Sequence, residues 1–335
     1  MVWGWRFTQL LGAIALAFAP QPLIAEEPQA AALSGGNVHF VPTAEEAERP
    51  ERFRLEEAEF AWRAEPIRSG SRKLEIFEIT FPSPIATDCA ANNTVHCEYY
   101  RPLSGEEPGP AVIVLHILGG DFQLARVFCN LMAQRGTAAL LLKMPYYGPR
   151  REGCEGRRMV AADAEDAVAG MTQAVLDIRR AATWLAERPE VDGEQLGVMG
   201  ISMGGITAAL AAGVEPRLKN VCLLLAGGDL ARLAAESTEL EDERQRWVRE
   251  GRSTEDFGER MAPVDPLTYA ANLRGRRVLM LNARDDTVVP RGCAESLWKA
   301  AGEPEIEWFP GGHYDLARNL FTALERVGTF YAPRE

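Results

Sequence analysis

From residue 73 onward, apolar runs alternate with amphipathic stretches along the chain. Residues 111–118 (AVIVLHIL) and 137–144 (TAALLLKM) are apolar runs of the kind that predicts strands buried on both faces of a sheet. The same pattern predicts further strands at 195–200, 220–226, 276–283 and 305–309, and helices at 161–188, 203–212 and 291–301 and in the stretches that end at Arg135 and Tyr331. Strands that alternate with helices indicate the α/β class, with a mainly parallel sheet covered on both faces.

Two more strand-like segments, 74–81 and 95–101, precede this alternation. A turn-rich stretch joins them, which predicts an antiparallel hairpin at the edge of the sheet. Cys89 and Cys97 flank this turn, and we predict a disulfide between them. Cys222 lies in an apolar run and is expected to be a buried thiol. The sequence does not indicate how the remaining cysteines pair, which are Cys129, Cys154 and Cys293.

The first residues have the layout of a secretory signal, because Arg6 precedes an apolar stretch at 10–19 that is followed by prolines and acids. This stretch is too short to span a bilayer comfortably. We therefore expect residues 1–25 to be a signal peptide and the mature protein to be exported, the alternatives being an uncleaved anchor or an apolar N-terminus that is no signal at all. Residues 26–72 are expected to form an N-terminal extension, and residues 73–335 the folded domain.

The net charge of the 335-residue chain is −12, and its sequence shows no basic patch of the size that nucleic acid or an anionic membrane surface requires. A small-molecule partner is therefore favoured, and the mature protein is expected to have no stable membrane span. His96, between Cys89 and Cys97, has no second pair of zinc ligands at the usual spacing, so no metal site is expected. The oligomeric state cannot be read from the sequence.

Residues 200–205 (GISMGG) place Ser202 on the predicted turn from a strand into a helix. A serine at such a turn adopts a strained backbone that holds its hydroxyl above the sheet, and Gly200 and Gly204 leave room where strand and helix nearly touch. The amide of Met203, at the start of the helix, is placed to stabilise a developing oxyanion. This pattern predicts a nucleophilic serine; the alternative is a glycine-rich turn with an incidental serine.

A serine nucleophile needs a histidine base, and this type of turn predicts it further along the chain. Of the four histidines, His313 alone follows Ser202, in a glycine-flanked loop between the last strand and the last helix. The imidazole in turn needs a carboxylate. Asp285 and Asp286 directly follow the predicted strand at 276–283, and either could be the acid while the other caps a helix or structures the turn.

The motifs G-I-S-M-G-G, D-T-V-V-P and G-G-H, in this order, resemble the α/β-hydrolase superfamily from about residue 73 to residue 331, most closely its dienelactone-hydrolase-like and esterase branches. The resemblance implies a triad of Ser202, Asp286 and His313, since the acid is usually the aspartate four residues before the proline; Asp285 is kept in reserve. Dienelactone hydrolases carry a cysteine nucleophile where this chain has serine, so their substrate is not carried over. No cofactor is implied.

The segment LHILGGDF resembles the family's turn that supplies the second oxyanion donor, which implies the Leu118 amide, with Ile117 or Gly119 as alternatives. His116 is then expected to be structural.

Two further segments could shape specificity. Residues 143–158 leave the carboxyl end of a strand and bring Tyr146, Tyr147, Arg150 and Arg151 forward as possible substrate contacts, or only as a surface loop. Residues 228–262 are an insertion where the superfamily often places a lid, and their charge suggests a solvated helical cap.

Together these features predict an exported serine hydrolase that forms an acyl-enzyme on Ser202, with a small carboxylic ester as its substrate. One alternative is a peptidase of the prolyl-oligopeptidase type, although no region the size of a β-propeller precedes the hydrolase part. The other is a hydrolase fold used only for binding. The acyl and alcohol groups of the substrate cannot be read from the sequence.

Overall fold

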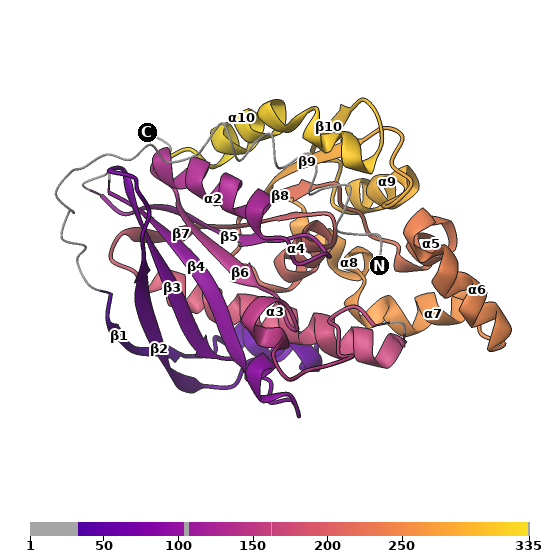
Figure 1. Cartoon of the computed structure of the whole chain (residues 1–335), viewed down its shortest axis with the longest axis horizontal. Coiled ribbons are helices and arrows are strands. Elements are labelled where there is room, and N and C mark those ends of the chain that lie inside the picture. Colours follow the sequence, from indigo (N-terminus) through magenta and orange to yellow (C-terminus); the bar gives the residue numbers. More distant parts are fainter. Residues whose placement is uncertain (1–32, 104–106, 162, 334–335) are drawn as a thin grey trace.

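The computed structural model describes residues 33–103, 107–161 and 163–333 (Figure 1). The predicted signal peptide, and the start of the predicted extension, lie outside the described residues. In the part of the chain that is described, no helix is both long and apolar enough to cross a membrane.

Ten strands of the described chain form one mixed sheet in the order β1-β2-β3-β4-β6-β5-β7-β8-β9-β10. The strands are β1 (Gly35–Phe40), β2 (Ala58–Ile67), β3 (Leu74–Pro82), β4 (Thr94–Pro102), β5 (Gly109–Leu115), β6 (Ala138–Lys143), β7 (Val191–Ile201), β8 (Asn220–Leu224), β9 (Arg277–Ala283) and β10 (Glu305–Phe309). The strands from β6 across to β10 are parallel, while β1 to β4 are antiparallel and β4 joins β6 antiparallel. The predicted α/β architecture is confirmed, and its antiparallel edge has two strands more than the expected hairpin.

Helices cover both faces of this sheet (Figure 1). They are α2 (Gln123–Gln134), α3 (Ala164–Ala186), α4 (Met203–Val214), α5 (Leu230–Glu236), α6 (Glu241–Arg249), α7 (Thr254–Met261), α8 (Pro266–Tyr269), α9 (Arg291–Ala300) and α10 (Leu320–Tyr331). Buried side chains of α3, α4 and α9 form one apolar core with the sheet, and those of α2 and α10 form a second core on the opposite face. The strands between the two cores are buried along almost their whole length, which explains their continuous apolar runs.

The predicted N-terminal extension contributes β1 and β2 to the same sheet. Its Trp62 packs edge-on against Trp184 of α3, with ring centroids 5.5 Å apart. Alternate residues of β2 are buried in its first half, so this strand is amphipathic rather than continuously apolar.

A buried ion-pair cluster also fastens this N-terminal part to the core. Arg179 of α3 is 1% exposed and pairs with Glu46 at 2.7 Å and with Glu215 at 3.0 Å. Burial alone would raise the pKa of Glu215, but Arg217 and Arg179 outweigh it and lower that pKa to about 2. Because Glu46 belongs to the N-terminal segment, the cluster ties this segment to the helices behind the sheet.

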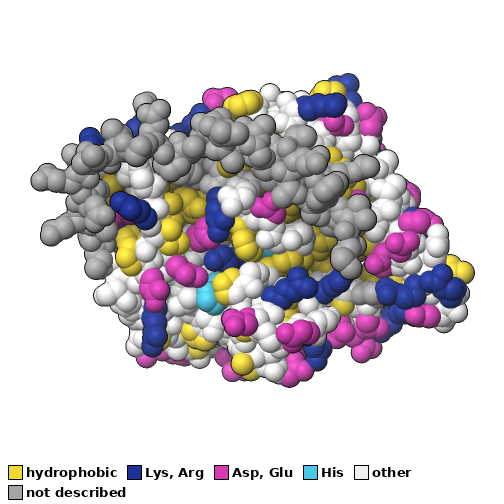
Figure 2. All heavy atoms as spheres, in the orientation of Figure 1, with side chains coloured by type: hydrophobic (Ala, Val, Ile, Leu, Met, Phe, Trp, Pro, Cys, Tyr) yellow, Lys and Arg dark blue, Asp and Glu magenta, His cyan; other side chains and the backbone are white. Residues whose placement is uncertain are grey.

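The predicted cap segment forms α5, α6 and α7, which lie at one end of the molecule (Figure 1). Acidic and basic side chains are interspersed over this end on the face that Figure 2 shows. The sequence of α6, EDERQRWVR, accounts for much of this mixture. Trp247 of α6 stacks on Phe257 of α7 with ring centroids 4.6 Å apart, so the two helices share a small apolar contact of their own.

Candidate active site

Ser202 lies between β7 and α4, at the carboxyl end of the parallel sheet. Its backbone has φ 56° and ψ −118°, a conformation that non-glycine residues rarely adopt and that costs on the order of 1–3 kcal/mol. A Cβ on Gly200 would come within 2.1 Å of the Gly204 carbonyl oxygen, and a Cβ on Gly204 within 2.5 Å of the His116 carbonyl oxygen. The two glycines therefore allow the sharp turn and press the start of α4 against the end of β5.

The structure brings together the three residues expected to form the triad. The Nε2 of His313 lies 2.9 Å from the Ser202 hydroxyl, and its Nδ1 lies 2.7 Å from Oδ2 of Asp286. All three residues are buried, with between 6% and 8% of their surface exposed. Such burial excludes most water from the three side chains and keeps the hydrogen bonds between them strong.

Asp286 is held by its own turn as well as by His313. Its Oδ1 accepts hydrogen bonds from the backbone amides of Val288 and Val289, both at 2.8 Å, which leaves Oδ2 for the imidazole. Asp285, the reserve acid, is exposed, and its amide donates to the Gly311 carbonyl oxygen at 3.0 Å. The structure therefore places Asp286, and not Asp285, against His313.

The loop after β5 was expected to supply an oxyanion donor. Leu118 is half-buried there, and a turn closes over it with a 3.2 Å hydrogen bond from the Gly120 amide to the Ile117 carbonyl oxygen. Met203, the other expected donor, is the first residue of α4. The donor roles of Met203 and Leu118 stay predictions, and Ile117 and Gly119 stay the alternatives.

His116 is a structural residue in this turn. Its Nδ1 donates to the Ile117 carbonyl oxygen at 2.8 Å, and its Nε2 accepts the Met144 amide at 3.1 Å. Complete burial lowers the pKa of His116 to about 4, so the ring is neutral and fits this donor-acceptor pattern. The imidazole thereby connects the loop after β5 to the loop after β6.

The loop after β6 divides the four residues proposed as substrate contacts. Tyr146 and Tyr147 are half-buried and Arg151 is exposed. Arg150 is completely buried and pairs with Asp177 of α3 at 2.8 Å. The prediction that Arg150 contacts substrate is wrong, because its guanidinium is buried in this internal ion pair and cannot reach a substrate. A polar residue between apolar ones in the middle of α3, Asp177, was the sequence signal for a buried partner.

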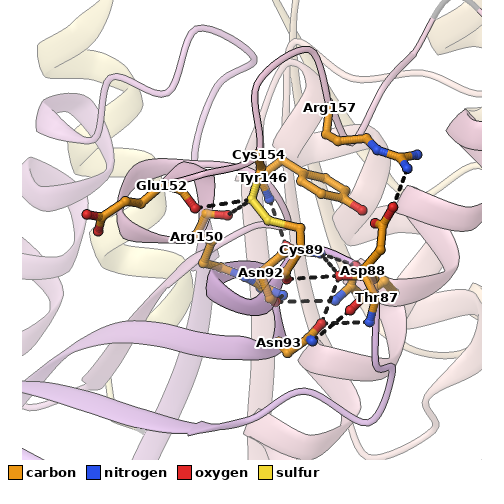
Figure 3. Close-up of a disulfide and its surroundings, with 11 residues drawn as sticks. Thr87, Asp88, Cys89, Asn92, Asn93, Tyr146, Arg150, Glu152, Cys154 and Arg157 are labelled. Atoms are coloured by element: carbon orange, nitrogen blue, oxygen red, sulfur yellow. Dashed lines mark hydrogen bonds and ion pairs between the residues drawn. A yellow bond between two sulfur atoms is a disulfide. The ribbon is translucent and has the colours of Figure 1, made fainter.

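The disulfide prediction is also wrong. Cys89 is bonded to Cys154, with 5.6 Å between the Cα atoms, and not to Cys97 (Figure 3). Cys97 is a free thiol on β4, where it is packed in the sheet core opposite Ile79 and Leu142. Its side chain thus faces the core, while Cys89 lies in the turn between β3 and β4, next to the loop after β6.

The predicted cap segment is joined, through Ser237, Thr238 and Glu239, to the loops that carry the acid and the base. The Ser237 hydroxyl donates to the Val288 carbonyl oxygen at 2.7 Å, and the Thr238 amide donates to the Thr287 carbonyl oxygen at 2.8 Å. The hydroxyl of Tyr314, next to His313, donates a hydrogen bond to Oε1 of Glu239 at 2.7 Å. These bonds support the positions of the acid and base loops from the outside.

Family models and curated proteins that resemble this chain are mostly hydrolases. Residues 45–232 match the family model described as alpha/beta hydrolase domain containing 18, and residues 170–306 match that of the prolyl oligopeptidase family. An uncharacterized protein of Mycobacterium tuberculosis is 32% identical over 258 residues, which are 73% of this chain and 60% of that protein. The chain thus spans 60% of the length of these curated relatives. The 2,6-dihydropseudooxynicotine hydrolase of Paenarthrobacter nicotinovorans is 30% identical over 166 residues, 48% of this chain and 41% of that protein.

Among solved structures, the acetyl xylan esterase of Paenibacillus sp. R4 superposes with a TM-score of 0.63 at 20% identity, covering 80% of this chain and 88% of its own. Acetyl xylan esterase 1 of Thermoanaerobacterium sp. JW/SL YS485 gives the same TM-score of 0.63 at 19% identity, over 81% and 88% of the two chains. At this identity the likeness shows the fold, which is that of esterase-like hydrolases. Since the first family model covers more than half of the chain, the protein belongs to the α/β-hydrolase superfamily, in the family described as alpha/beta hydrolase domain containing 18.

Proposed function

We propose that the protein is a serine hydrolase of small carboxylic esters that works through an acyl-enzyme on Ser202. The observation that carries this proposal is the continuous chain of hydrogen bonds from Ser202 through His313 to Asp286, at 2.9 Å and 2.7 Å. A histidine without a catalytic role is not expected to bridge a buried serine on a strained turn and a buried aspartate. The esterase-like fold supports the same reaction class.

In this mechanism the Ser202 hydroxyl attacks the ester carbonyl carbon while Nε2 of His313 takes its proton. Asp286 stabilises the imidazolium that forms. The tetrahedral oxyanion is stabilised by the amides of Met203 and Leu118, at the positive end of α4. The intermediate then collapses: the bond to the alkoxy group breaks, the alcohol leaves with the proton from His313, and the acyl group stays on Ser202. Water repeats these steps to release the acid and restore the serine.

A peptidase activity is the second candidate, because residues 170–306 match the prolyl oligopeptidase family model. The matched region includes Ser202 and Asp286, which an esterase of the same fold also needs. The match therefore supports a serine-hydrolase mechanism but does not distinguish a peptide substrate from an ester. Whether the leaving group is an alcohol or an amine is a matter for substrate panels.

The test has two parts. A fluorophosphonate probe should label the wild-type protein stoichiometrically at Ser202, and Ser202→Ala should abolish labelling and lower ester turnover by several orders of magnitude without lowering the melting temperature. Panels of p-nitrophenyl esters of graded chain length and of peptide p-nitroanilides then separate the esterase from the peptidase. A protein that is folded but unlabelled, and inactive on both panels, would sink the proposal and favour a binding role.

We also propose that the protein is exported. The disulfide between Cys89 and Cys154 supports this, because such bonds persist in oxidising compartments. Expression of the full chain, followed by fractionation and N-terminal sequencing of the mature protein, should find cleavage near residue 25. Reduced full-length protein retained in the cytosol of its own host would contradict it.

A further inference from the structure

Tyr147 lies against the two segments that carry the predicted oxyanion donors. Its hydroxyl lies 3.9 Å from Sδ of Met203, the residue that follows the nucleophile. Its ring packs edge-on against His116 with centroids 4.8 Å apart, and a Cβ on Gly120 would come 2.9 Å from its Cδ1. The phenol therefore rests on the loop after β5 and reaches to the start of α4, the two segments expected to hold the substrate carbonyl oxygen.

The loop that carries Tyr147 is held in place by the turn before β4. The preceding amide, that of Tyr146, donates to Oδ1 of Asn92 at 3.0 Å, and Arg150 donates to the Asn92 carbonyl oxygen at 2.8 Å. Beyond Arg150, the disulfide of Cys154 to Cys89 attaches the same loop to the turn before β4, as Figure 3 shows. A side chain on such a support is in place before the substrate binds, which is the condition for an electrostatic contribution to the rate.

The hydroxyl of Tyr147 has a weak partner in the substrate-free protein. Within the described residues its one hydrogen-bond acceptor is the thioether of Met203, and sulfur at 3.9 Å is a poor acceptor. Burial raises the pKa of Tyr147 well above its ordinary value, against the opposing charges of Arg158 and Arg151, so the group is a neutral donor at physiological pH. A half-buried donor with so weak an acceptor has free energy to gain from a better one.

We propose that the Tyr147 hydroxyl donates a hydrogen bond to the oxyanion of the tetrahedral intermediate, as a third donor beside the amides of Met203 and Leu118. The inference rests on the proposed function, because an oxyanion forms only if Ser202 attacks a carbonyl. A negative oxygen is a much stronger acceptor than either the thioether or the neutral ester carbonyl. The bond therefore strengthens as the reaction proceeds, and such an interaction raises kcat more than it lowers KM.

The test compares Tyr147→Phe with wild type on the best ester of the panel. We expect kcat to fall about 10- to 100-fold with KM changed less than about threefold, in line with the loss of one oxyanion donor. The inhibition constant of a trifluoromethyl ketone matched to the substrate, which forms a stable oxyanion on serine, should rise by a similar factor. Since the lost hydroxyl has only a sulfur partner, the melting temperature should stay at its wild-type value.

Tyr269→Phe is the matched control. It removes the hydroxyl of another partly buried tyrosine, one that donates to the Pro263 carbonyl oxygen at 3.0 Å and packs beside Gly213, at the opposite end of α4 from Ser202, and it should leave kcat unchanged. A Tyr147→Phe variant with kcat within twofold of wild type, or with a change confined to KM, overturns the inference while fluorophosphonate labelling of Ser202 keeps the proposed function intact. A wild-type protein that is neither labelled nor active overturns both.

Discussion

Replacement of Asp286 by asparagine tests the geometry of the triad more sharply than its removal does. In the native protein Oδ1 accepts two backbone amides, those of Val288 and Val289, and Oδ2 accepts Nδ1–H of His313. The side-chain amide of asparagine has one oxygen and one NH₂ group. The two backbone donors require the oxygen, so the NH₂ group must face His313.

This orientation reverses the hydrogen bond to the imidazole. An NH₂ group facing Nδ1 needs an acceptor there, so the ring proton moves to Nε2, where the native ring accepts the Ser202 proton. His313 then holds the wrong tautomer and cannot act as the base. We expect kcat to fall by about 10³–10⁴-fold, which corresponds to about 4–5.5 kcal/mol of transition-state stabilisation.

The assay is steady-state hydrolysis of a p-nitrophenyl ester by Asp286→Asn, Asp286→Ala and Asp285→Asn, each checked for folding by thermal melting. Because alanine presents no donor to Nδ1, part of the Asp286→Ala population keeps the productive tautomer, and its kcat should exceed that of Asp286→Asn several-fold. Asp285→Asn should stay near wild type, because that side chain is exposed. Equal kcat values for the two Asp286 variants would refute the tautomer reasoning, and a larger loss in Asp285→Asn would move the acid role to that residue.

Two further predictions concern the supports of the fold. Arg179→Leu should destabilise the protein by about 3 kcal/mol at pH 7, measured by urea denaturation. This is the low end of the cost of breaking a buried ion pair, because Glu46 still pairs with Arg49 and Glu215 with Arg217. The pKa of Glu215 is lowered, so its pairing stabilises the fold above pH 4.5 and is lost as pH falls toward about 2. The deficit of the variant should therefore shrink at pH 3; an equal deficit at both pH values would show a packing defect instead. Cys154→Ser opens a disulfide that spans 65 residues and should cost about 4 kcal/mol by loop entropy, with a fall in kcat/KM because the loop of Tyr147 loses an anchor. Unchanged denaturation midpoints, or free thiols at Cys89 and Cys154 in unreduced peptide maps of exported protein, would contradict this.

The parallel half of the sheet could be predicted from the sequence because its strands are buried on both faces. Residues 111–118 and 137–144, for example, become β5 and β6 with bounds shifted by at most three residues. Strand β2 was missed for the opposite reason. In its sequence AEFAWRAEPI, buried and exposed positions alternate, with Phe60 and Trp62 facing inward and charged residues facing outward. This two-residue alternation is short and follows an acidic run, so the sequence does not distinguish it from a solvated segment.

The errors around the loop after β6 have one cause, which is pairing over long sequence distances. Cys154 meets Cys89 only because β6 lies beside β4 in the sheet, and Cys97 was nearer along the chain. The sequence offers Arg150 as a substrate contact or a solvated loop residue because a loop arginine is usually accessible, whereas its partner Asp177 lies 27 positions away on a helix predicted for other reasons. No local pattern contains these contacts.

The triad and the specificity loop therefore differ in how the chain encodes them. Ser202, Asp286 and His313 lie one, three and four residues after the ends of β7, β9 and β10, so the order of these parallel strands brings them to the same edge of the sheet. Tyr147 also follows a strand, but its place depends on two other segments: α3, which supplies Asp177 of the buried ion pair, and the turn before β4, which supplies Asn92 and Cys89. A substitution in those supports can move Tyr147 without disturbing the triad. We infer that relatives of this chain can keep the chemistry of Ser202 while their rates and substrate preferences diverge through this loop.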